Sequence, residues 1–185
     1  FNYLKSFYWV EKFMIKNFFV TAIIAISATT AAAEGCYGGA GLASVKAKEG
    51  IYSYGSTNTM LLFGCDFNDF FALEGETSWM LKKDKVTIGS TSVSLGITHS
   101  AAFAKFTMPT SNELKPYVRL GMSKAKASAT VGATTVSTDD TAFAWGVGAE
   151  FNYDESTGIR LDYSASSYED STDGTVMSLT VVLRE

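Results

Sequence analysis

The chain has 185 residues, the size of one domain, with few charged residues (18%), many aromatic ones (14%), 16 glycines and only 2 prolines. This composition is typical of an all-β protein whose outer surface is not fully in water, and it argues against a disordered chain. A net charge of −4 without a Lys/Arg cluster argues against nucleic acid as a partner.

Residues 14–33 are typical of a secretory signal peptide. Met14 is followed by the cationic Lys16, an apolar run at 18–26 and small residues at 27–33. The apolar run is well short of the roughly 20 residues that a membrane-spanning helix needs. We therefore expect a cleaved signal; an uncleaved anchor is the alternative.

Cleavage is expected between Ala33 and Glu34. Residues 1–13, which are rich in aromatic side chains, are interpreted as an upstream extension that is not native, and residues 34–185 as the mature domain. Cleavage leaves 12 basic and 18 acidic side chains, a net charge of −6. A domain of this charge is a poor partner for anionic polymers.

The mature part contains eight segments in which bulky apolar residues alternate with small or polar ones. A period of two residues is typical of β-strands with two chemically different faces. Turn-forming runs of Asp, Asn, Ser and Gly separate several of these segments. The expected strands are 37–48, 57–66, 70–82, 91–105, 116–126, 141–153, 158–168 and 175–184.

The first strands differ in how clearly they alternate. In 37–48, the glycines at 38–41 blur the pattern. In 70–82, bulky residues such as Leu73 point to one face, and two carboxylates, Glu74 and Glu76, point to the other. In 91–105, the bulky face is Val93, Leu95 and Ile97, and the same parity places His99 on the outward face.

The later strands alternate more sharply. In 116–126, Arg119 points to the face away from its bulky neighbours in the strand. From Phe143 to Tyr153 every second residue is large or apolar. In the strand 158–168, Leu161 and the other bulky residues point to one face, and Arg160 and Asp162 point to the other.

Small and charged residues thus share one face of most strands. A narrow barrel interior can hold glycine, serine and paired charges but not eight strands of Phe, Trp and Leu. The pattern therefore predicts an eight-stranded antiparallel up-and-down transmembrane β-barrel with its bulky residues towards lipid. The alternative is a soluble, lipocalin-like periplasmic barrel. The expected lipid-facing aromatic girdle comprises Trp79, Phe143, Trp145, Phe151, Tyr153 and Tyr163.

An even number of strands places both termini at the same end of the barrel, which we expect to face the periplasm. The connections there are 66–70, 106–115 and 154–158. The connections at the outer surface are expected to be the longer ones, as in bacterial barrels generally. They are 49–56, 83–90, 127–140 and 169–174.

Six inward charges are expected to pair across the lumen, because isolated charges in a narrow interior are costly. Glu150 is expected to pair with Arg160 on the adjacent strand, and Glu74 or Glu76 with Arg119 or Arg160. Such pairs would plug the bore; solvated side chains in a wet lumen are the alternative. The full set is Glu74, Glu76, Arg119, Glu150, Arg160 and Asp162.

The two cysteines, Cys36 and Cys65, fall at the same rim of neighbouring strands. The bacterial periplasm is oxidising, so we expect a disulfide. Two free thiols in poor register, or a lipidated Cys36, are the alternatives.

The sequence argues against an enzyme. His99 is its only histidine, no Gly-x-Ser-x-Gly motif is present, and no set of residues has metal-ligand spacing. Glu74 and Glu76 share a face but are interpreted as a structural pair rather than as a catalytic one. No cofactor or metal is expected.

Five segments resemble the small OmpA-like and opacity-type outer-membrane barrels of the porin family: 37–42, 67–74, 115–121, 144–151 and 158–163. The resemblance covers nearly all of 36–184. It implies lumen ion pairs that involve Glu74, Glu150 and Arg160. One departure is the final Leu183-Arg184-Glu185, where relatives carry an aromatic residue that the barrel-assembly machinery reads.

The sequence thus predicts a structural, surface-interacting barrel of the bacterial outer membrane. Its expected partners are outer-membrane lipid, the barrel-assembly machinery and an extracellular ligand bound through the outer loops. A narrow porin-like channel for small solutes is the alternative function.

Overall fold

The computed structural model describes residues 35–49, 52–88, 91–110, 113–168 and 172–184. The expected signal peptide, 14–33, and the extension, 1–13, lie outside the described residues. No helix in the described ranges is long and apolar enough to cross a membrane.

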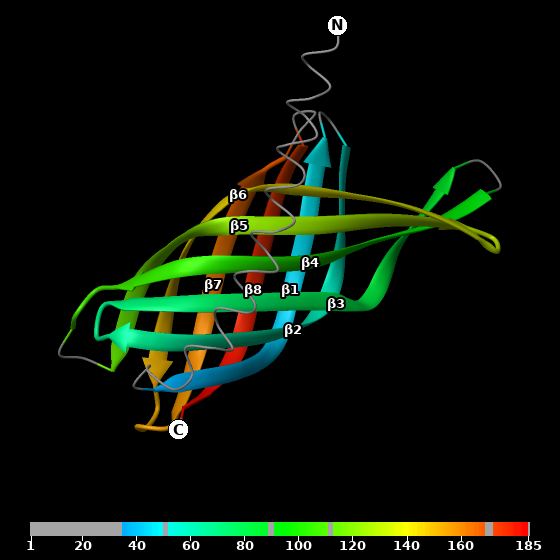
Figure 1. Cartoon of the computed structure of the whole chain (residues 1–185). Coiled ribbons are helices and arrows are strands. Elements are labelled where there is room, and N and C mark those ends of the chain that lie inside the picture. The colour runs from blue at the N-terminus through cyan, green and yellow to red at the C-terminus, as the bar shows by residue number, and fades with distance from the viewer. Residues whose placement is uncertain (1–34, 50–51, 89–90, 111–112, 169–171, 185) are drawn as a thin grey trace, which may run out of the picture. The chain divides into compact units, whose positions relative to one another are not determined.

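Eight antiparallel strands close into a barrel in which each strand pairs with the next and β8 pairs with β1 (Figure 1). The predicted eight-stranded up-and-down fold is confirmed. The strands are β1 Cys36–Glu49, β2 Tyr52–Asn68, β3 Phe71–Ile88, β4 Thr91–Thr107, β5 Leu114–Val131, β6 Thr134–Asn152, β7 Thr157–Ser167 and β8 Thr172–Arg184.

The barrel has two ends, which we name by what lies there. The terminal end carries the start of β1, the end of β8 and the connections 69–70, 108–113 and 153–156. The hairpin end carries the connections β1–β2, β3–β4, β5–β6 and β7–β8.

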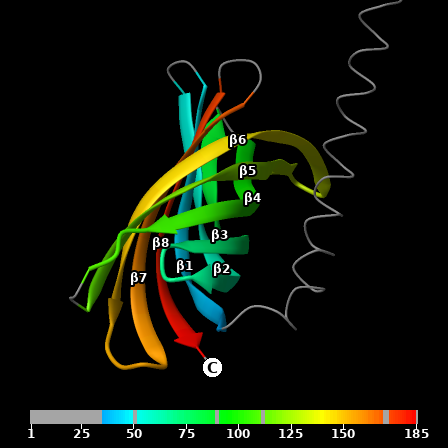
Figure 2. The same cartoon turned by 60° about the vertical axis from the view of Figure 1, so that its left-hand side comes forward.

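The connections at the hairpin end are shorter than the sequence predicted. The expected loop 127–140 is wrong, because β5 and β6 remain paired as far as Val131 and Thr134. Gly132 makes the turn with φ of 58°, a left-handed conformation that favours glycine. Alternating Ala, Thr and Val residues suit a strand. The β5–β6 hairpin leans away from β1, β2, β7 and β8 at this end (Figure 2).

Burial alternates along the strands as the sequence predicted for most of them. In β7, Arg160 and Asp162 are buried, with 0% and 2% of their surface exposed, whereas Ile159 and Leu161 between and beside them are 49% and 55% exposed. The bulky side chains therefore cover the outside of the barrel, and the charged ones occupy its interior.

Strand β4 is the exception. His99, predicted to face outward, is buried inside the barrel, and Ile97 and Phe103 share its face. The outward positions at this level carry small residues such as Ala102 and Ala104. The parity read from the first residues of this strand was therefore wrong.

The interior also contains an apolar layer, which was not predicted from the sequence. Ala43, Val45, Met60, Ile97 and Val176 form a buried cluster inside the barrel. Inward-facing apolar residues therefore occupy the lumen together with the charges.

Candidate functional site

The centre of the lumen is an ion pair between β7 and β3, across the barrel. Arg160 places Nη1 2.6 Å from Oε1 of Glu74 and Nη2 2.7 Å from Oε2, and both side chains are fully buried. Two parallel N–H···O bonds to one carboxylate fix both distance and orientation. Arg160 Nε also donates to Asp162 Oδ2 at 3.0 Å and to Tyr117 Oη at 2.6 Å.

A second arginine extends this network towards the hairpin end. Arg119 Nη1 donates to Glu76 Oε2 at 2.7 Å, and its Nη2 donates to Ser164 Oγ at 2.7 Å and lies 3.5 Å from Asp162 Oδ1. The guanidinium carbon lies 4.3 Å from the ring centroid of Phe103, within range of a cation–π contact. Asp162 therefore links the two arginines.

Lys105 and Tyr37 complete the network and were missed in the sequence. Lys105 Nζ lies 3.2 Å from Glu74 Oε1 and donates to Tyr37 Oη at 2.7 Å, and Tyr37 donates in turn to Glu74. The signal for Lys105 was available, because a lysine on the lipid face of a barrel is costly. Tyr37 had no such signal, because the neighbouring glycines hide the parity of β1.

The charges of this network balance within the described residues. Three carboxylates, of Glu74, Glu76 and Asp162, face three cations, of Arg119, Arg160 and Lys105. Buried charges are tolerated when they are paired and hydrogen-bonded. The arrangement is suited to holding opposite walls of the barrel together.

Glycines on neighbouring strands make room for the large lumen side chains. Tyr37 lies opposite Gly64 in the β1–β2 register, and Tyr117 lies opposite Gly148 in the β5–β6 register. A Cβ at Gly64 or Gly148 would overlap the tyrosine ring that it faces. These glycines are therefore required by space rather than by backbone conformation.

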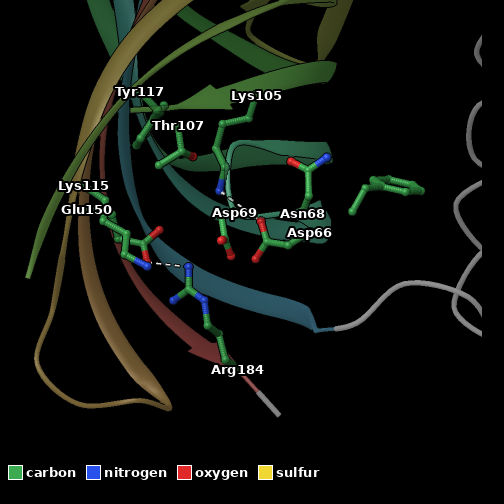
Figure 3. A pocket seen from close by; sticks show the side chains of 10 residues that line it. Asp66, Asn68, Asp69, Lys105, Thr107, Lys115, Tyr117, Glu150 and Arg184 are labelled. Atoms are coloured by element: carbon green, nitrogen blue, oxygen red, sulfur yellow. Dashed lines mark ion pairs between the residues drawn. The ribbon is translucent and has the colours of Figure 1, made fainter. Parts of the chain in front are cut away.

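Glu150 lies outside the central network, in a polar cavity of about 240 Å³ at the terminal end (Figure 3). Its carboxylate is 2.5 Å from Arg184 Nη2, and across the cavity Lys105 Nζ lies 3.9 Å from Asp66 Oδ1. Glu150 and Arg160 are neighbours in register, as expected, but Arg160 directs its guanidinium to Glu74 and Asp162 instead. The expected Glu150–Arg160 pair is replaced by Glu150–Arg184.

His99 faces Glu76 inside the lumen. Its Nδ1 lies 3.7 Å from Glu76 Oε1, and neither atom has a hydrogen-bond partner among the described residues. No group of three or more His, Cys, Asp or Glu side chains in the described ranges is arranged to hold a metal ion.

The remaining predicted residues lie on the outside or at the rim. The predicted Cys36–Cys65 disulfide is present and joins β1 to β2 at the terminal end. All six residues of the expected girdle have between 37% and 78% of their surface exposed; five lie on the outer face of strands, and Tyr153 lies in the connection 153–156. They are Trp79, Phe143, Trp145, Phe151, Tyr153 and Tyr163.

The family model for the outer membrane protein beta-barrel domain matches residues 18–184 of the chain. No curated protein matches the chain in sequence.

Three solved structures share the fold. Ail, the attachment invasion locus protein of Yersinia pestis, is 18% identical with a TM-score of 0.62, and the match covers 82% of this chain and 98% of Ail. Neisserial surface protein A is 18% identical with a TM-score of 0.63, covering 81% and 98% of the two chains. OprG of Pseudomonas aeruginosa is 11% identical with a TM-score of 0.60, covering 83% and 96%.

Proposed function

The chain belongs to the outer membrane protein beta-barrel domain family, and from this we propose that it is a non-enzymatic, surface-interacting barrel whose lumen is closed by ion pairs. The family places it in the bacterial outer membrane. A soluble lipocalin-like barrel, the alternative kept open by the sequence, does not agree with this family or with the exposed bulky residues on the barrel's outside.

The observation that carries the proposal is the buried pair of Arg160 and Glu74. The two residues come from β7 and β3, on opposite walls, and their head groups meet inside the lumen with 0% side-chain exposure. A hydrated ion would have to displace a bidentate, charge-assisted contact to pass. A narrow solute channel is therefore the less favoured alternative.

The outer contacts are assigned to the hairpin end. Strands β5 and β6 extend beyond the ion-pair network of Arg119 and Arg160 towards the hairpin end. Their tip at 131–135 is exposed. Ail, which shares the fold, is named for attachment and has been solved with the heparin analogue sucrose octasulfate. This supports an extracellular ligand for the hairpin end, although the acidic charge of this chain favours a ligand that is not a polyanion.

The orientation follows from the same asymmetry. We assign the terminal end to the periplasm, because the long β5–β6 hairpin extends the barrel at the other end and external extensions are the longer ones in bacterial barrels. We propose that the exposed apolar band contacts outer-membrane lipid and that the barrel-assembly machinery folds and inserts the chain.

The lack of enzymatic activity is supported by the position of His99. It is 3% exposed and faces the lumen, so it cannot serve a catalytic site at the rim. The carboxylates of Glu74 and Glu76 are occupied by Arg160 and Arg119.

Planar-bilayer recording of the purified mature barrel tests the closed lumen. We expect no stable conductance from the parent protein and ion flux from the variant Arg160→Ala. A steady open channel in the parent protein would favour the porin-like function instead. Insertion of a protease site at Gly132, compared with one at Ser156, tests orientation: in intact cells only the Gly132 site should be cut.

A further inference from the structure

A row of apolar residues crosses the inner face of the β5–β6 hairpin and of the β4 segment beside it. Leu95 lies opposite Ala129, and Ala129 lies opposite Val136, in continuous registers without a bulge. Side chains alternate between the two faces of a strand, and Ala129 has the same parity in β5 as the buried Arg119. This row therefore faces the barrel interior.

A cavity of about 220 Å³ lies on this face at the hairpin end. Its apolar lining comes from Tyr54 of β2, Leu95 of β4, Ala127 and Ala129 of β5 and Val136 of β6. Within the described residues its lining carries no charged side chain. The lining also includes the hydroxyl-bearing Ser128, Ser137 and Thr138, and Ser128 Oγ donates to the carbonyl oxygen of Gly96 at 3.3 Å.

The cavity continues into the buried apolar layer of the lumen. Tyr54 and Ala125 pack against the cluster that contains Met60 and Ile97. Below this cluster, Asn58 donates to the carbonyl oxygen of Ile97 and to Ser78, which begins the polar part of the interior. The apolar surface thus runs from the exposed hairpin to the polar part of the interior.

We propose that this cavity binds one unbranched hydrocarbon chain. Its volume is below the roughly 300–1,000 Å³ of pockets for drug-sized ligands, so a narrow chain fits better than a ring system. Its walls offer apolar contact and no charge for a head group, which would stay at the open side. Among the lining residues, Val136 has 68% of its surface exposed, so burial by a bound hydrocarbon chain would stabilise the complex most at this residue.

The proposal goes beyond the surface role described above and does not depend on a closed lumen. Conduction and hydrocarbon binding are measured separately, so one can fail while the other stands.

The first test measures binding of radiolabelled dodecanoic acid, an unbranched chain with a free methyl end, to the mature barrel in nanodiscs, with empty nanodiscs subtracted. Ala129→Trp fills the cavity and Val136→Asp places a carboxylate in it, and each should weaken binding by roughly tenfold or more. Thr135→Asp carries the same charge on the opposite face of the hairpin and should stay within about twofold of the parent. Equal binding by all four proteins, or none above the empty nanodiscs, would overturn the proposal.

A second measurement needs no variant. Doxyl-labelled stearic acid should broaden the NMR methyl signals of Ala127 and Ala129 but not that of Ala144, which is buried deeper in the barrel. A phospholipid with the same label on its acyl chain distinguishes the sources: broadening by both probes indicates a membrane lipid, and broadening by the acid alone indicates a free fatty acid. If neither probe broadens Ala127 or Ala129, the assignment is wrong.

Discussion

Removing the guanidinium of Arg160 should destabilise the barrel more than any exposed charge change. The variant Arg160→Ala leaves the fully buried Glu74 without its bidentate partner. Breaking a buried ion pair on one side costs about 3–5 kcal/mol. Lys105 at 3.2 Å and Arg119 at 3.7 Å remain beside the carboxylate and offset part of the loss. We therefore expect the lower end, about 3 kcal/mol.

The assay is reversible urea unfolding of the mature barrel in lipid vesicles. The fluorescence of Trp79 and Trp145, which lie on the exposed outer face, follows the transfer of the barrel out of the bilayer. The matched control is Lys124→Ala, which removes an ion pair with Asp139 whose side chains are 43% and 53% exposed. Exposed pairs contribute about 1 kcal/mol at most.

A double-mutant cycle separates the pair from its surroundings. Glu74→Gln in the Arg160→Ala background removes the charge that the single variant leaves without its partner, so the two changes together should cost less than their sum. Additive losses, or an Arg160→Ala change no larger than that of Lys124→Ala, would refute the view that this pair holds the two walls together.

Three further predictions follow from the geometry. Replacing Cys36 and Cys65 by serine opens a cross-link that spans 29 residues, and the urea midpoint should fall by the equivalent of about 3–4 kcal/mol, an effect that reductant should reproduce in the parent protein. Gly148→Val places a side chain in the space of the Tyr117 ring and should cost about 1–3 kcal/mol; if the same midpoint is unchanged, the proposed need for space is wrong. Leu161→Arg puts a cation on the lipid face and should cost up to about 4 kcal/mol in vesicles, whereas a loss of only a few tenths would place this residue away from the hydrocarbon.

The sequence predicted the barrel well where its two faces differ most. In β6 and β7 the contrast between bulky residues such as Trp145 and inward ones such as Gly146, Arg160 and Asp162 leaves one parity possible. The identity of the buried charges follows from this parity alone. Their partners do not, because parity says which face a side chain is on but not how far across the lumen it reaches.

The pairing of Glu150 illustrates that limit. Glu150 and Arg160 are adjacent in register, and a local rule pairs them. The long Arg160 side chain instead reaches the opposite wall at Glu74, where burial is complete, and leaves Glu150 to Arg184 near the rim. Both side chains of the Arg160–Glu74 pair are fully buried, whereas Arg184 in the Glu150 pair is 21% exposed, so water competes less for the Arg160–Glu74 contact.

In strand β4 the bulky residues and the charged residues predict opposite faces, and the placement with the lower free-energy cost is the one observed. Bulky Val93 and Ile97 favoured an outward face, but His99 and Lys105 have the same parity. An apolar side chain loses little by facing a lumen that already contains Val45 and Met60. A lysine on the lipid face is unfavourable by up to about 4 kcal/mol, the cost being largest at the bilayer midplane. Where charged and bulky residues of a barrel strand predict different faces, the charged residues therefore decide. This rule places Ile97 inside the barrel, where it packs beside the cavity that we propose binds a hydrocarbon chain.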